Sequence, residues 1–160
     1  MKVFVTVPTT GWVHKRVAYT LLRLQLDQRY KLRIMLPTHV PFENNLHHCR
    51  KDFLRNGEDY WLSIDADNPP INNPLDLVEL GLPLVGFPTP VWHNTGNGER
   101  PIYWNVYKKH GEAYKEWPDK KGLQRVDAVG TGCFIVSRPL MQHMKDGPFL
   151  RKHNPDGTGS

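Results

Sequence analysis

Two aspartates, Asp65 and Asp67, stand one residue apart directly after the apolar run at residues 60–64. This run is typical of a short buried β-strand, and the prolines at positions 69 and 70 prevent its continuation. Because residues two apart on a strand point to the same side, we expect the two carboxylates to converge where the strand ends. Like charges held this close need a cation or hydrogen-bond donors between them. A divalent Mg²⁺ or Mn²⁺ ion bridging carboxylate and phosphate oxygens would meet that need, and the alternative is a pair that caps the following turn.

A second candidate segment, Gly130-Thr131-Gly132, interrupts an apolar stretch that runs from Val126 to Val136. Glycines at these positions indicate either a β-bulge or a close approach of another backbone, and both are compatible with a segment that lines a ligand. No Gly-Lys-Ser or Gly-Lys-Thr follows, which excludes a phosphate-binding loop of the Walker type.

The residues before Asp65 alternate between strand and helix patterns. We expect strands at 3–7, 31–36 and 60–64 and amphipathic helices at 14–25 and 44–55. This alternation is typical of a three-layer α/β/α domain with a mostly parallel central sheet. Ligands of such sheets collect at the carboxyl ends of the strands, where both the loop at residues 8–11 and the aspartate pair would lie.

The second half of the chain is less regular. We expect a short helix at 73–80, a strand at 84–87, a long aromatic-rich loop insertion at 88–124 and a short helix at 139–145. In that insertion Trp92, Tyr103 and Trp104 either stack on a sugar or base or pack the loop onto the domain. His93, in the same loop, either contacts a ligand or is solvated.

The composition indicates one globular domain spanning residues 1–160, with 39% hydrophobic and 23% charged residues. A net charge of +5 favours anionic ligands such as a sugar diphosphate, but no basic stripe interleaved with aromatics predicts specific nucleic-acid binding. Two cysteines are too few for a disulfide framework or a structural zinc site. No apolar run approaches the length of a membrane span or a signal peptide, and we expect a cytoplasmic protein.

Three segments together resemble the GT-A fold of nucleotide-sugar-dependent glycosyltransferases, especially the family-2-like members of bacteria and phages. They are the opening strand that runs into Pro8-Thr9-Thr10-Gly11, the Asp65-Ala66-Asp67 motif, and the segment at residues 126–138. The resemblance spans residues 3 to about 145, and an Asp-x-Asp motif alone would be a weak signal.

The resemblance implies a role for each segment. Asp65 and Asp67 would hold Mn²⁺ or Mg²⁺ and, through it, the diphosphate of a UDP- or GDP-sugar. Pro8, Thr9 and Thr10 would lie against the nucleotide, and Gly130, Thr131 and Gly132 would line the floor near the transferred sugar. The acceptor would be a glycan or another hydroxyl compound. The general base of such enzymes lies in a downstream acidic motif, so we expect it beyond Ser160 and the chain to be C-terminally incomplete.

Two other functions remain open from the sequence. A sugar-nucleotidyltransferase shares the carboxylate chemistry but normally has a Gly-rich, basic N-terminal loop, whereas residues 8–16 contain one glycine, with Lys15 and Arg16 late. A non-catalytic nucleotide- or glycan-binding module is favoured by the missing base. A two-metal nuclease would need further carboxylates grouped with the pair, and Asp52, Asp59 and Asp76 show no suitable spacing.

Overall fold

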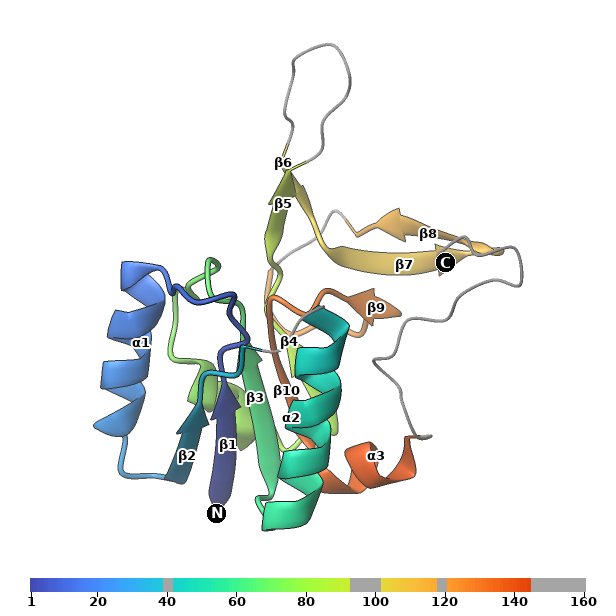
Figure 1. Cartoon of the computed structure of the whole chain (residues 1–160). Helices are drawn as coiled ribbons and strands as arrows, with labels where there is room; N and C mark the ends of the chain where they lie inside the picture. The colour runs from blue at the N-terminus through green and yellow to red at the C-terminus, as the bar shows by residue number, and fades with distance from the viewer. Residues whose placement is uncertain (39–41, 93–101, 118–120, 145–160) are drawn as a thin grey trace.

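A mixed five-stranded sheet forms the centre of the molecule (Figure 1). The structure, a computed structural model, describes residues 1–38, 42–92, 102–117 and 121–144. The strand order is β2-β1-β3-β10-β4, and the bounds are β1 Lys2–Thr6, β2 Lys31–Met35, β3 Tyr60–Ile64, β4 Leu84–Gly86 and β10 Cys133–Ser137. β1 pairs in parallel with β2 and β3, whereas β10 runs antiparallel to both β3 and β4. The expected α/β class is therefore confirmed, with one reversed strand inserted between two that share a direction.

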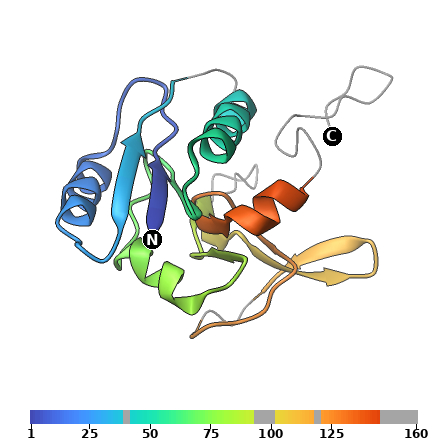
Figure 2. The ribbon, with the colours of Figure 1, turned by 90° about the horizontal axis from the view of Figure 1, so that it is seen from below.

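Helices cover both faces of this sheet. Helix α1 (Lys15–Gln25) and the 3₁₀ helix η1 (Pro74–Leu80) lie over one face, and α2 (Phe42–Asn56) and α3 (Arg138–His143) lie over the other (Figures 1 and 2). Because successive strand residues point to opposite faces, β1 sends Val3 and Val5 into the α1 core and Phe4 into the α2 core. β3 divides its residues in the same way, and its central position buries it on both faces.

Local signals fix where these elements begin and end. The His14 imidazole Nδ1 accepts a hydrogen bond from the Arg16 backbone N–H at the start of α1. Asn73 caps η1 in the same manner, and Gly81 ends it with a left-handed backbone (φ 63°). The helices expected at 14–25 and 44–55 are confirmed, the one expected at 139–145 is observed over Arg138–His143, and the one expected at 73–80 forms a 3₁₀ helix.

Residues 88–124, expected to form a long loop, contain four short strands where the structure describes them, β5 to β8 (Figure 1). β5 (Pro90–Trp92) pairs with β6 (Ile102–Trp104), and β7 (Val106–His110) pairs with both β8 (Ala113–Glu116) and β9 (Ala128–Val129). β5, β6 and β8 have only three or four residues, and the five residues of β7, Val-Tyr-Lys-Lys-His, do not form the apolar run that marks the strands of the central sheet, which is why the sequence pattern did not reveal them.

None of the described helices is long and apolar enough to cross a membrane. Residues 145–160, which include the Gly- and Pro-rich end of the chain, lie outside the described part.

Candidate functional site

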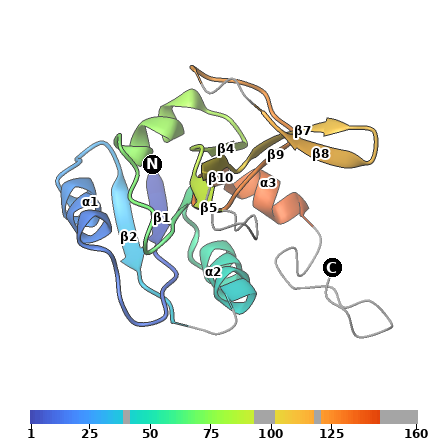
Figure 3. The same ribbon diagram turned by 90° about the horizontal axis from the view of Figure 1, so that it is seen from above.

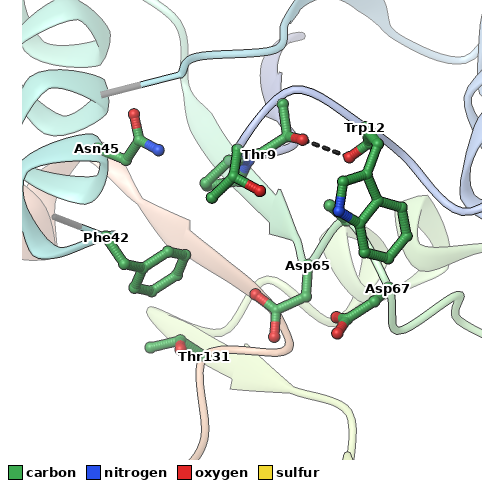
Figure 4. Close-up of a pocket in the computed structure, with 10 residues that line it drawn as sticks. Thr9, Trp12, Phe42, Asn45, Asp65, Asp67 and Thr131 are labelled. Carbon is green, nitrogen blue, oxygen red and sulfur yellow. Dashed lines mark hydrogen bonds between the residues drawn. The ribbon is translucent and has the colours of Figure 1, made fainter. Parts of the chain in front are cut away.

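A cavity of about 370 Å³ opens at the carboxyl ends of β1 and β3, the edge where the sequence predicts a ligand site (Figure 4). Four segments form its wall: the loop after β1, the segment after β3, the start of α2, and Thr131 just before β10. The lining residues are Pro8, Thr9, Thr10, Trp12, Phe42, Asn45, Asp65, Ala66, Asp67 and Thr131. Five of the residues predicted from the sequence to bind metal or nucleotide are thus in one place: Pro8, Thr9, Thr10, Asp65 and Asp67.

The Asp65-Ala66-Asp67 segment is fixed from both sides by backbone hydrogen bonds. The Asp65 N–H donates to the Gly132 carbonyl at 2.8 Å, which holds the segment against the residue that precedes β10. The Ala66 carbonyl accepts from the His14 N–H at 2.7 Å, which ties it to the start of α1. With the backbone held in this way, both carboxylates point toward the space between Trp12 and Thr131 (Figure 4).

The electrostatics of the pair are unfavourable without a cation. Burial raises the pKa of Asp65 from 3.8 to about 6, and the negative charge of Asp67 adds to the rise. Neither carboxylate forms an ion pair with any described residue. A half-buried acid beside a second acid is the arrangement that the sequence predicted for a cation site.

Thr9 shapes the loop that forms one wall of the cavity. Its N–H donates to the Pro37 carbonyl at 3.0 Å, and its hydroxyl accepts from the Gly11 N–H at 3.1 Å. The same hydroxyl donates to the Trp12 carbonyl. Because the Thr9 hydroxyl already has two partners, its main effect is to hold the loop, while Thr10 and the 59% exposed Trp12 are accessible to a ligand.

Sequence reasoning missed three residues of this cavity. Phe42 and Asn45 come from the first turns of α2, and Trp12 follows the loop residues that were identified. The signal that could have found the first two is topological, because a helix that follows a parallel strand begins at the carboxyl end of that strand. Phe42 points into the cavity from the α2 side, opposite Trp12 (Figure 4), and the buried Asn45 lines it from the next turn of the helix.

At Gly130 and Gly132 the side chains of Asn105 and Thr89 lie directly against the glycine backbone. A Cβ atom on Gly130 would lie 1.9 Å from the Asn105 Nδ2 atom, and one on Gly132 would lie 2.3 Å from the Thr89 Oγ1 atom. Asn105 and Thr89 are themselves joined by two hydrogen bonds, of 3.1 Å and 2.9 Å. The glycines therefore allow Thr89 and Asn105 to pack against the segment between β9 and β10. Thr131, which stands between the two glycines, lines the cavity.

The aromatic residues predicted for the sugar or acceptor side lie elsewhere. Trp104 is half-buried on β6, where its backbone N–H donates to the Glu116 Oε1 atom at 3.0 Å, and Tyr103 beside it is exposed. Neither residue lines the cavity. The side chain of Trp92 and all of His93 lie outside the described residues. A second cavity of about 560 Å³ lies between β4 and residues 122–129, and Trp117 is its aromatic residue.

The donor set at Asp65 and Asp67 fits a hard cation, because both ligands are carboxylate oxygens. Within the described part of the chain, no group of three or more His, Cys, Asp or Glu side chains could hold a metal ion. An ion at this pair would therefore take its other ligands from phosphate oxygens and water, which is usual for Mg²⁺.

Comparisons with known proteins give information on the fold. No protein-family model matches the chain, and no curated protein matches it at a significant level. Among solved structures it is similar to A197 from STIV, with a TM-score of 0.63 and 20% sequence identity over 98% of this chain and 73% of that one. HddC from Yersinia pseudotuberculosis is similar at a TM-score of 0.44 and 13% identity, over 99% of this chain and 88% of the other. The likeness to A197 shows a shared fold, and the likeness to HddC is too weak to carry an inference.

Proposed function

We propose that this protein is a glycosyltransferase of the three-layer, Rossmann-like GT-A type that uses a nucleotide-sugar donor and a divalent metal ion. The observation that carries the proposal is the shared cavity, in which the Asp65/Asp67 pair faces the loop at residues 8–12 from the adjacent strand. A volume of about 370 Å³ is in the range of small-molecule sites. A donor in this position would be a UDP- or GDP-sugar, and the acceptor a glycan or another hydroxyl compound.

Each wall of the cavity has a distinct task in this proposal. Asp65 and Asp67 would hold Mn²⁺ or Mg²⁺, which when bound stabilises the charge of the departing nucleoside diphosphate. The rings of Trp12 and Phe42 offer flat apolar faces on opposite sides, suited to a base or to the C–H face of a sugar.

Transfer to a hydroxyl acceptor needs a general base that removes the hydroxyl proton. The acids that line the described cavity are Asp65 and Asp67, both given to the metal. This observation favours, as a second candidate, a non-catalytic module that binds the nucleotide or glycan without transfer. A sugar-nucleotidyltransferase has no comparable support, because residues 8–16 lack its Gly-rich, basic loop.

The first experiment is isothermal calorimetry of the purified chain with UDP and with GDP, each with and without Mn²⁺. We expect binding of one nucleotide that requires Mn²⁺ and is lost in Asp67→Asn. The matched control is Glu112→Gln, an exposed acid in the β7–β8 turn, which should leave the affinity unchanged. Equal affinity in Asp67→Asn and the parent protein would refute the metal assignment.

A transfer assay then separates the two candidates. Release of UDP or GDP from the matching nucleotide-sugar, dependent on an added hydroxyl acceptor, identifies a transferase. Metal-dependent binding with no turnover of any nucleotide-sugar supports the binding module.

A further inference from the structure

Helix α1 carries an apolar stripe on the face that points away from the protein. Tyr19 is 63% exposed, Leu22 is 64% exposed and Leu26, at the end of the helix, is 80% exposed. At 3.6 residues per turn these three positions fall within a sector of about 60°. Val17 and Leu24, which are fully or almost fully buried, lie on the opposite side of the helix. The helix therefore has two apolar faces, whereas a surface helix of a globular protein normally has one, which packs against the core.

Positive charge accompanies the stripe. Lys15 lies at its N-terminal end, and Arg16 and Arg23 lie on one flank, about a quarter turn away and about two turns apart along the helix. The helix contains no acidic residue. Among the described residues none of these three cations takes part in an ion pair. The first acid beyond the helix, Asp27, is bound by Arg29 at 2.6 Å.

The position of α1 leaves this face open. Seen from the front, from below and from above, α1 lies at one outer side of the molecule, next to β2 and far from the β7–β8 hairpin (Figures 1, 2 and 3). The high exposure of Tyr19, Leu22 and Leu26 shows that no described segment covers the stripe.

We propose that the outward face of α1 docks on an anionic lipid surface, with the helix lying in the plane of the headgroups. Leu22 and Leu26 would enter the boundary of the acyl chains, and Tyr19 would place its ring there with its hydroxyl among the headgroups. Lys15, Arg16 and Arg23 have long side chains that reach the lipid phosphates from the flank of a helix held in this plane.

Other occupants fit the charges less well. A second copy of the chain, joined through the same face about a twofold axis, would present the same three cations and no acidic residue from its own α1. Residues 145–160 contain three Lys or Arg against two Asp, so they do not supply the complementary charge. A bilayer, unlike an acidic protein, needs no matching groove to accept a single convex helix.

The test is co-sedimentation of the whole chain with vesicles of phosphatidylcholine alone and of phosphatidylcholine with phosphatidylglycerol. We expect binding to the anionic vesicles, weak or no binding to the neutral ones, and a loss of binding between about 0.05 M and about 0.5 M NaCl. Leu22→Asp should weaken binding at least about tenfold, and Arg23→Gln about fivefold, the effect of one positive charge near an anionic surface.

The matched control is Ile71→Asp, which changes an equally apolar residue that is 96% exposed on a different segment. It should bind as the parent protein does, and circular dichroism should show the same fold and melting temperature for all variants. The proposal is overturned by absence of binding to anionic vesicles, by equal binding to neutral ones, or by equal effects of Leu22→Asp and Ile71→Asp. Dimerisation that Leu22→Asp abolishes, without vesicle binding, would overturn it in favour of a second copy. Because no nucleotide is present, these outcomes are independent of the proposed transferase activity.

Discussion

Replacing Asp65 by asparagine should make the metal-free protein more stable at neutral pH. Asp65 is half-buried, its carboxylate has no cationic partner among the described residues, and Asp67 adds a second negative charge. An asparagine has nearly the same shape but no charge to desolvate. We expect the gain because functional sites often lower the stability of the folded protein in order to bind a ligand.

The magnitude follows from the pKa of the side chain. A rise of the Asp65 pKa from 3.8 to about 6, at 1.36 kcal/mol per pKa unit, comes to about 3 kcal/mol of unfavourable interaction above pH 6. The sign follows from linkage, because the folded state binds the Asp65 proton more tightly than the unfolded state does. The proton's stabilising contribution is complete below pH 3.8 and is lost as the pH rises to about 6. Asp65→Asn should therefore gain up to about 3 kcal/mol in unfolding free energy at pH 7.5, and progressively less below pH 6.

Urea unfolding at pH 7.5 and pH 4.5, in the presence of a chelator, measures this difference. Asp67→Asn should give a smaller gain, because it removes only the charge repulsion and leaves the burial of Asp65 unchanged. Glu112→Gln, an exposed acid far from the cavity, should change stability by less than about 0.5 kcal/mol. Added Mn²⁺ should stabilise the parent protein and not Asp65→Asn, because only the former retains both carboxylates.

A loss of stability in Asp65→Asn at pH 7.5 would refute this reasoning. It would mean that the Asp65 carboxylate is stabilised by partners in the folded protein, as in the turn-capping alternative. A gain that does not shrink between pH 7.5 and pH 4.5 would also refute the reasoning, since the charge of Asp65 would then not be its cause.

Two further predictions test the packing around the site. Gly132→Ala should lower the free energy of unfolding by about 1–3 kcal/mol, because its Cβ would lie 2.3 Å from the Thr89 Oγ1 atom. Adding Thr89→Ala should recover part of this loss, and purely additive effects in the double variant would contradict the contact. Burial raises the pKa of the Cys49 and Cys133 thiols to about 12, so iodoacetamide at pH 8 should label them in urea but hardly at all in the folded protein; rapid native labelling would show that the thiols are accessible.

Much of the fold follows from local patterns in the sequence. The strand at 60–64 was predicted with its observed bounds, because an apolar run between a glycine-containing turn and two prolines leaves few alternatives. The helices α1 and α2 were predicted within two residues of their ends from the spacing of their apolar residues. The strands β5 to β8 were not predicted, since each depends on pairing with another short strand and its own sequence carries little signal.

The sequence by itself determined that Asp65 and Asp67 stand at the end of a buried strand, since a local apolar run and its termination are properties of neighbouring residues. Only the tertiary structure decided what surrounds them. The order of the strands brings the loop after β1 beside the end of β3, and α2 adds Phe42 and Asn45 to the same cavity. The reversed β10 supplies the Gly132 carbonyl that holds the Asp65 N–H. These contacts join residues far apart in the chain, and they depend on the sum of packing and hydrogen bonding over the whole sheet, which no local pattern encodes.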